Sequence, residues 1–147
     1  MTGRAGRDAI PGRGLIQTYM PEHPVIQALV SADRDTFYER EIAARREAGL
    51  PPFGRLVSLL VSGSSREAVE AYARSVALVA PPAAKIQVLG PAEAPLSVIR
   101  GRHRYRLLVK ATREADLQAY LRLWLSEVPK AKGDLRLTVD VDPYSFL

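Results

Sequence analysis

Arg100-Gly-Arg-His-Arg-Tyr-Arg-Leu-Leu-Val-Lys110 is the stretch around which the rest of the chain is organised. It is predicted to form a turn followed by a β-strand, in which successive side chains point to opposite faces. One face then carries four cations and a leucine, namely Arg102, Arg104, Arg106, Leu108 and Lys110. The other face carries His103, Tyr105, Leu107, Val109 and Ala111. The strand therefore offers one face to a hydrophobic core and a row of cations on the other.

The row of cations has two interpretations. Charged runs are often only a solvated surface that keeps a protein in solution. The alternative is a contact for phosphate groups, which the sequence favours because no acidic residue stands among the four cations. We predict that contacts with these phosphate groups come from Arg100, Arg102, Arg104, Arg106 and Lys110. Such contacts fix position rather than base sequence, and they weaken steeply as salt increases.

The composition is that of an ordinary globular protein with a basic surface. The 147 residues are 47% hydrophobic and 25% charged, and the net charge of +5 favours an anionic partner such as nucleic acid. The chain has no cysteine, which excludes disulfides and thiolate zinc sites and fits a reducing, cytoplasmic location. No apolar run approaches the ~20 residues that cross a bilayer, so no membrane partner is expected.

The part of the chain before residue 55 is predicted to form one strand and two helices. Residues 15–20 have the pattern of a short strand, and a turn leads from them to a helix at residues 24–32. A second helix is predicted at residues 35–48, with Asp33 or Asp35 as its cap. A proline-rich connector follows that helix and marks a domain boundary.

From residue 55 onward, the patterns follow the order β-α-β-β-α-β. The expected elements are a strand at 55–62, a helix at 64–80, a strand at 86–89 with 96–100 as its continuation or edge, a strand at 104–111, a helix at 112–128 and a strand at 135–141. A capping box from Ser64 to Glu67 opens the first helix, and Thr112 caps the second. This order predicts an α+β fold of the ferredoxin-like, split-βαβ type, with two helices on one face of an antiparallel sheet. The cations then lie on the uncovered face.

The sequence shows no self-contained active site. It contains neither the Gly-x-x-x-x-Gly-Lys phosphate loop nor a His-Glu-x-x-His or comparable metal-binding spacing. His23 and His103 have no nucleophile and base around them, so both are expected to be structural or solvated. Asp140 and Asp142 are expected to end a strand or to pair with the basic face rather than to act as acid and base. No metal and no cofactor are therefore expected for this chain.

Several motifs, taken in order, resemble those of one family. Gly3-Arg4-Ala5-Gly6-Arg7 resembles the second half of the Gln-x-x-Gly-Arg-x-Gly-Arg motif of ATP-dependent helicases. The motifs that follow resemble the primosomal protein N′ (PriA) family of replication-restart helicases, namely Ile16-Gln17-Thr18, Pro21-Glu22-His23-Pro24, Glu41 with Arg45-Arg46, Leu50-Pro51-Pro52-Phe53, Val88-Leu89-Gly90-Pro91, Arg100-Gly101-Arg102, Tyr105-Arg106 and Asp140-Val141-Asp142-Pro143. The resemblance covers nearly the whole chain.

The resemblance implies that the chain is the C-terminal part of such a helicase. Residues 1–33 would be the end of the second helicase lobe, and residues 34–54 a helix with its connector. Residues 55–147 would be a C-terminal DNA-binding domain of ferredoxin-like type, similar to a ribosomal protein. Arg4 and Arg7 would reach nucleotide phosphates in the full helicase, with Arg7 as the arginine finger that stabilises charge on the γ-phosphate.

The resemblance also implies partners and cofactors. The family unwinds DNA in the 3′-to-5′ direction and restarts stalled replication forks. Its partners are single-stranded and forked DNA, other primosome proteins and the tail of the single-stranded DNA-binding protein, for which Arg113 and Gln118 would form part of the site. ATP with Mg²⁺ and zinc are implied for the full-length family. Because their motifs are absent here, we expect this chain to bind DNA and to dock on the helicase core without hydrolysing ATP itself.

Two other functions stay open on the sequence alone. An RNA-binding module is one, although Tyr105 falls on the predicted core side, which leaves this strand without the usual aromatic platform. A purely structural or partner-docking domain is the other. The fold class by itself excludes neither.

Overall fold

The structure is a computed structural model, and it describes residues 14–143 of the chain. It divides into two units, with the boundary between Glu41 and Ile42. The elements in chain order are α1 (Pro24–Ser31), α2 (Arg34–Glu47), β1 (Gly54–Gly63), α3 (Arg66–Leu78), β2 (Ile86–Ile99), β3 (Arg102–Thr112), α4 (Leu117–Glu127) and β4 (Arg136–Val141). The order β-α-β-β-α-β predicted from residue 55 is confirmed.

The first unit contains α1 and most of α2, and both predicted helices are present. Pro24 occupies the first position of α1, where its missing N–H costs nothing. Nδ1 of His23 accepts a hydrogen bond from the backbone N–H of Val25 at 3.3 Å. At the start of α2, Oδ1 of Asp33 accepts from the N–H of Thr36 at 3.1 Å. Asp33 is therefore the cap of the second helix.

The prediction of a strand at residues 15–20 is wrong. These residues are irregular, and the side chains of Leu15 and Tyr19 are fully exposed. A strand needs a neighbour to receive its backbone hydrogen bonds, and the described part of the first unit contains only helices. The alternation of residue types was therefore not sufficient to form a strand.

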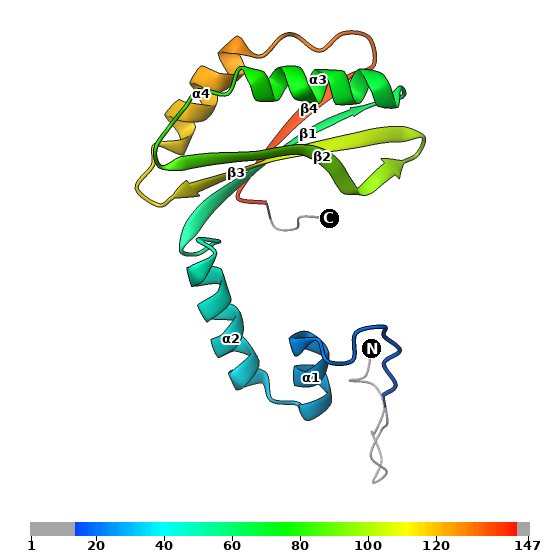
Figure 1. Ribbon diagram of the computed structural model, residues 1–147, viewed down its shortest axis with the longest axis vertical. Coiled ribbons are helices and arrows are strands. Elements are labelled where there is room, and N and C mark those ends of the chain that lie inside the picture. Colours follow the sequence, from blue (N-terminus) through cyan, green and yellow to red (C-terminus); the bar gives the residue numbers. More distant parts are fainter. Residues whose placement is uncertain (1–13, 144–147) are drawn as a thin grey trace. The chain divides into compact units, whose positions relative to one another are not determined.

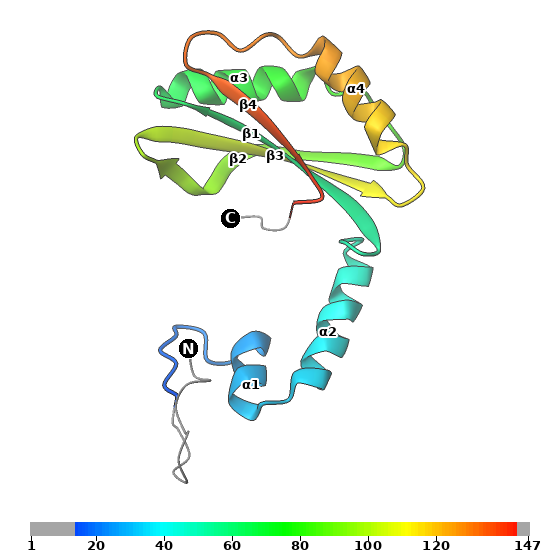
Figure 2. The same ribbon diagram turned by 180° about the vertical axis from the view of Figure 1, so that it is seen from behind.

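The second unit is built on a four-stranded antiparallel sheet in the order β2-β3-β1-β4. Both α3 and α4 cover the same face of this sheet (Figure 1 and, from behind, Figure 2). β1 lies between β3 and β4, so it is a central strand. The fold is therefore of the α+β class, and its sheet is open rather than closed into a barrel.

The hydrophobic core lies between the sheet and its two helices. Alternate residues of the central strands point into it, and each helix contributes one apolar face. The most buried members are Val57, Leu59, Val61, Val69, Ala73, Val76, Leu107, Val109, Leu117 and Trp124. Leu137 and Val139 of β4 pack against this core from the edge of the sheet. Both helices therefore bury one apolar face against the sheet.

β2 differs from its prediction because it is one long strand rather than two short segments. It runs through Gly90 and Pro91, and its pairing with β3 shifts register twice. β2 is an edge strand, and a proline on an edge costs no ladder hydrogen bond. The two register shifts take up the irregular residues, so the strand continues to Ile99.

The capping box predicted from Ser64 to Glu67 is also wrong, because the cap stands one residue later. Oγ of Ser65 accepts a hydrogen bond from the backbone N–H of Ala68 at 3.2 Å. The backbone N–H of Ser64 instead donates to a carboxylate oxygen of Asp134 at 2.8 Å. Ser64 therefore belongs to the connection before the helix.

The cap of α4 is also displaced from the predicted Thr112. Thr112 remains in β3, where it pairs with Gly54 of the central strand. The helix begins at Leu117, and Oδ1 of Asp116 accepts from the N–H of Ala119 at 2.9 Å. Strand pairing therefore outweighed the local preference of threonine for a helix cap.

Replacing Ser65 by alanine is expected to lower the free energy of unfolding by about 1 kcal/mol, because the first turn of α3 loses the hydroxyl that caps it. Ser64→Ala is the matched control and is expected to change stability by less than about 0.5 kcal/mol. Urea unfolding followed by circular dichroism measures both. A larger loss for Ser64→Ala than for Ser65→Ala would contradict this assignment of the cap.

Candidate nucleic-acid interface

The sheet face opposite α3 and α4 is called the open face below. Cross-strand pairs share a face, so the register with β3 identifies its members. They include Leu56, Ser58, Leu60 and Ser62 of β1, Gln87, Leu89 and Ala92 of β2, Arg102, Arg104, Arg106, Leu108 and Lys110 of β3, and Arg136, Thr138 and Asp140 of β4. Leu56 is the one member of this set that is almost fully buried, with 2% of its surface exposed. The alternation predicted for β3 is confirmed, because Tyr105, Leu107, Val109 and Ala111 are buried while the residues between them are partly exposed.

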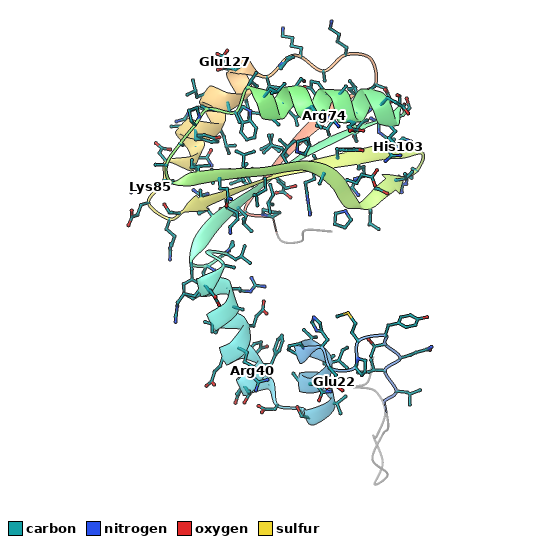
Figure 3. The ribbon with its side chains drawn as sticks, in the orientation of Figure 1. Glu22, Arg40, Arg74, Lys85, His103 and Glu127 are labelled. Atoms are coloured by element: carbon teal, nitrogen blue, oxygen red, sulfur yellow. The ribbon has the colours of Figure 1, made fainter. Side chains whose placement is uncertain are left out.

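A two-residue turn, Arg100-Gly101, joins β2 to β3. Both residues have positive φ angles, 50° for Arg100 and 73° for Gly101, which is the requirement of a type I′ hairpin turn. An arginine adopts this left-handed conformation at a cost that glycine or asparagine would largely avoid. The turn places Arg100, which is exposed, at the tip of the hairpin. Figure 3 shows His103 at this end of the sheet and Lys85 at the opposite end.

Arg102 is held by internal contacts at the same end of the sheet. Its guanidinium donates to Oδ2 of Asp134 at 3.2 Å and to the backbone carbonyl of Asp134 at 2.6 Å. It also donates to the carbonyl of Ser62 at 3.1 Å. The hydrogen bond from the backbone of Ser64, together with Arg102, holds the pKa of Asp134 below its ordinary value. Arg102 therefore ties the start of β3 to the loop before β4.

Arg104 and Arg106 occupy the part of the open face next to the turn. Nη1 of Arg104 donates to the backbone carbonyl of Leu96 at 3.2 Å, which anchors one end of its guanidinium on the hairpin. Arg106 stands opposite Leu60 of β1 and Ala92 of β2. Both arginines are partly exposed. Arg106 therefore presents positive charge beside apolar neighbours, whereas Arg104 stands beside the polar Ser62.

Lys110 lies apart from these arginines, at the other end of β3. It lines a shallow cavity of about 360 Å³ together with Phe53 and Lys85. The guanidinium carbon of Arg46 lies 4.7 Å from the centre of the Phe53 ring. Lys85 pairs with Glu114 at 2.7 Å. The sequence grouped Lys110 with the arginines, but the structure separates it from them by Leu108.

The prediction that Asp140 and Asp142 end a strand or pair with the basic face is confirmed in its first part, because Asp142 directly follows the last residue of β4. Asp142 pairs with Arg55 at 2.8 Å rather than with the basic face, and the hydrogen bond from Arg55 is the main reason that the pKa of Asp142 is lowered. Asp140 lies on the open face, where it stands opposite Ser58. The open face thus carries one acid that the spacing within β3 alone did not reveal.

Arg136 is a cation of the open face that sequence reasoning missed. It is exposed, and it pairs with Ser62 on the side of β1 away from Arg104. Its alternation with Leu135 and Leu137 was visible in the sequence and assigned it to a polar face. What was missing was the sheet order, which places β4 beside β1.

Two other predicted site residues, Arg113 and Gln118, do not lie on the open face. Arg4 and Arg7 lie outside the described residues. Arg113 is exposed in the turn after β3, and Gln118 is exposed as the second residue of α4. Their role in binding a partner stays a prediction.

The described residues show no group of three or more histidine, aspartate or glutamate side chains that could hold a metal ion. Within the same part of the chain, no helix has both the length and the apolar character needed to cross a membrane.

Comparisons with known proteins relate the chain to one family. The model of the primosomal protein N C-terminal domain matches residues 46–144. The replication restart protein PriA of Rickettsia conorii is 37% identical over 144 residues, which are 98% of this chain and 22% of that protein. PriA of Bacillus subtilis is 34% identical over 151 residues, which cover 100% of this chain and 19% of that protein. PriA of Haemophilus influenzae is 29% identical over 145 residues, which cover 97% of this chain and 20% of that protein. The chain thus spans about a fifth of the length of these relatives.

Proposed function

Because the chain belongs to the family of the primosomal protein N C-terminal domain, we propose that it acts in replication restart as the C-terminal part of a PriA-type helicase. In this proposal residues 1–33 form the end of the second helicase lobe and residues 55–147 form the C-terminal domain. Residues 34–54 form a helix and a connector between these two parts. The whole protein is an ATP-dependent 3′-to-5′ DNA helicase. Arg4 and Arg7 serve its ATPase site only in that context, and ATP with Mg²⁺ and zinc belong to the parts of the protein beyond this chain.

The fold of the second unit is proposed to be ferredoxin-like. The element order β-α-β-β-α-β supports this proposal, as does the sheet order β2-β3-β1-β4 with two helices on one face. Such a sheet leaves one face uncovered, which makes that face available to a partner. We therefore assign the proposed contact with DNA to the open face.

The role of the open face is to bind the sugar-phosphate backbone of DNA. The observation that carries this proposal is the set of cations at one end of the face, where Arg104 and Arg106 lie beside a turn that holds Arg100 in a costly left-handed conformation. Charged side chains of one sign repel each other, and a phosphate backbone removes that repulsion. Arg102 and Lys110 are weaker members of the set, because Arg102 bonds to Asp134 and Lys110 lies at the far end.

The partners proposed for the whole protein are single-stranded and forked DNA, other primosome proteins, the rest of the helicase and the tail of the single-stranded DNA-binding protein. Arg113 and Gln118 are the residues proposed for that tail. Their exposure in the turn before α4 and at the start of this helix supports the proposal, since both side chains are accessible.

Fluorescence anisotropy with labelled single-stranded and forked DNA, titrated with salt, tests the proposal. We expect micromolar or tighter binding at low salt, with an affinity that falls linearly in a log–log plot as phosphate contacts are screened. A competition with RNA of the same length determines whether the backbone contact distinguishes the two nucleic acids. The absence of binding at low salt would contradict the proposal and would leave a docking domain as the function of this part of the chain.

A further inference from the structure

Ser62 of β1 lies between two arginines on the open face. Its register partners are Arg104 on β3 and Arg136 on β4. Neighbouring strands are about 4.8 Å apart, so the backbones of these two arginines lie about 10 Å apart across the sheet. Ser62 is partly exposed and carries no charge. The arginines therefore form a row that crosses three strands, at a right angle to the row predicted along β3.

The positive charge is concentrated at one end of the open face. Arg106 follows Arg104 on the same side of β3, about 7 Å further along the strand. Arg100 occupies the tip of the adjacent turn. Further along the face, Asp140 stands opposite Ser58 and would repel a phosphate group. A backbone that followed β3 toward Lys110 would approach this acid, whereas one that crossed the strands at the turn would not.

Apolar side chains lie next to these cations. Leu60 stands directly opposite Arg106, and Leu89 pairs with Leu108 in the following row of the sheet. Leu89 is 39% exposed, so it is available to a ligand. The bases of a single strand expose apolar ring faces that a duplex keeps stacked inside, and single-strand binders combine cations for the backbone with surfaces for the bases. This pairing of cations and leucines fits a single strand better than a duplex.

We propose that a single strand of nucleic acid crosses the open face at its turn end, with phosphates on Arg104, Arg106 and Arg136 and bases against Leu60, Leu89 and Leu108. This inference rests on the function proposed above, and it adds Arg136 as a contact residue and the direction of the backbone. Lys110 lies off this route and contributes less than Arg136. Because leucines do not stack as aromatic rings do, the site has little preference among bases.

The test compares single charge reversals in the 147-residue chain by anisotropy with a labelled single strand and with a duplex of the same length. Arg136→Glu and Arg104→Glu are the test variants, and Lys110→Glu probes the route along β3. Arg122→Glu is the matched control, because Arg122 is exposed on α4, which covers the other face. Arg136 is exposed on an edge strand, so its variant is expected to stay folded, and thermal unfolding of each variant verifies this.

We expect Arg136→Glu and Arg104→Glu each to weaken single-strand binding by about fivefold or more, and to lower the slope of the log–log salt plot by about 0.7. Lys110→Glu should weaken single-strand binding less than either test variant, Arg122→Glu should stay within about twofold, and the duplex should bind more weakly than the single strand. If Arg104→Glu weakens binding but Arg136→Glu does not, this route is wrong while the proposed function stands. If all four variants weaken binding equally, or none does, the open face is not the binding surface and both proposals fail.

Discussion

Replacing Trp124 by alanine is expected to lower the free energy of unfolding by about 3–5 kcal/mol. Trp124 lies on α4 and is fully buried between this helix, α3 and the sheet. Its Nε1–H donates to the backbone carbonyl of Val76 at 2.9 Å, and its ring packs edge-on against Tyr120 with the centroids 5.8 Å apart. The substitution removes the largest fully buried side chain of the described core and leaves a cavity between the two helices.

Two further variants separate the causes of this loss. Trp124→Phe keeps an aromatic ring but removes the N–H group, so the carbonyl of Val76 loses its indole donor and the expected cost is about 1–3 kcal/mol. Leu123→Ala is the matched control on the same helix, because its side chain is 57% exposed. Its expected cost is below about 0.5 kcal/mol. Urea unfolding of the three variants gives these values, and an equal loss for Trp124→Ala and Leu123→Ala would contradict this account of the core.

The double variant Arg104→Glu/Arg106→Glu is expected to weaken binding to single-stranded DNA by more than about tenfold at low salt, because two phosphate contacts become two repulsions. The slope of the log–log salt plot should fall by about 1.4, since each neutralised phosphate of a single strand contributes about 0.7. Arg102 is left unchanged in this variant. Its bonds to Asp134 hold the loop before β4, so its replacement would alter stability as well as charge.

A control with the same change in net charge is Arg122→Glu/Lys130→Glu. Both residues are exposed, one on α4 and the other in the loop after it. If binding depended only on net charge, the two double variants would lose affinity equally. We expect the control to retain affinity within about threefold, because screened charges outside the contact surface act weakly at a distance. Equal losses would contradict a localised contact on the open face.

The features of the fold that depend on local periodicity, namely the order of the elements and their buried faces, could be predicted from the sequence. The alternation of residue types in β3 was sufficient to predict which of its faces is buried, because its apolar residues lie on one face. The register then orients Arg104 and Arg106 toward the open face. Each of α3 and α4 likewise has an apolar stripe in its sequence, and the burial of Val76 and Trp124 shows that these stripes face the core. The order of elements followed from these patterns without knowledge of any contact.

What depends on distant contacts was not predictable from the sequence. Ser64 and Ser65 are equivalent as local capping residues, and only the bond from the backbone of Ser64 to Asp134, 70 positions away, distinguishes them. Thr112 stays in a strand because Gly54 pairs with it. Residues 15–20 have no such strand partner within residues 14–143, and their strand pattern forms no strand.

The same limit applies to the candidate interface. The cations of β3 were visible as a run, but Arg136 joins them only because β4 lies beside β1. The same pairing brings Asp140 onto the open face. The bond between Arg102 and Asp134 joins the start of β3 to a loop that follows α4, and no short motif encodes it.

The most direct measurement of where nucleic acid binds is an NMR titration of the ¹⁵N-labelled chain with a short single strand of DNA. We predict shifts in the guanidinium signals of Arg104, Arg106 and Arg136 and in the backbone amides of β1, β3 and β4 around Ser62. The amides on the outer surfaces of α3 and α4 should not move. Shifts confined to those helices, or no shifts under conditions in which anisotropy detects binding, would contradict the claim that the open face is the nucleic-acid interface.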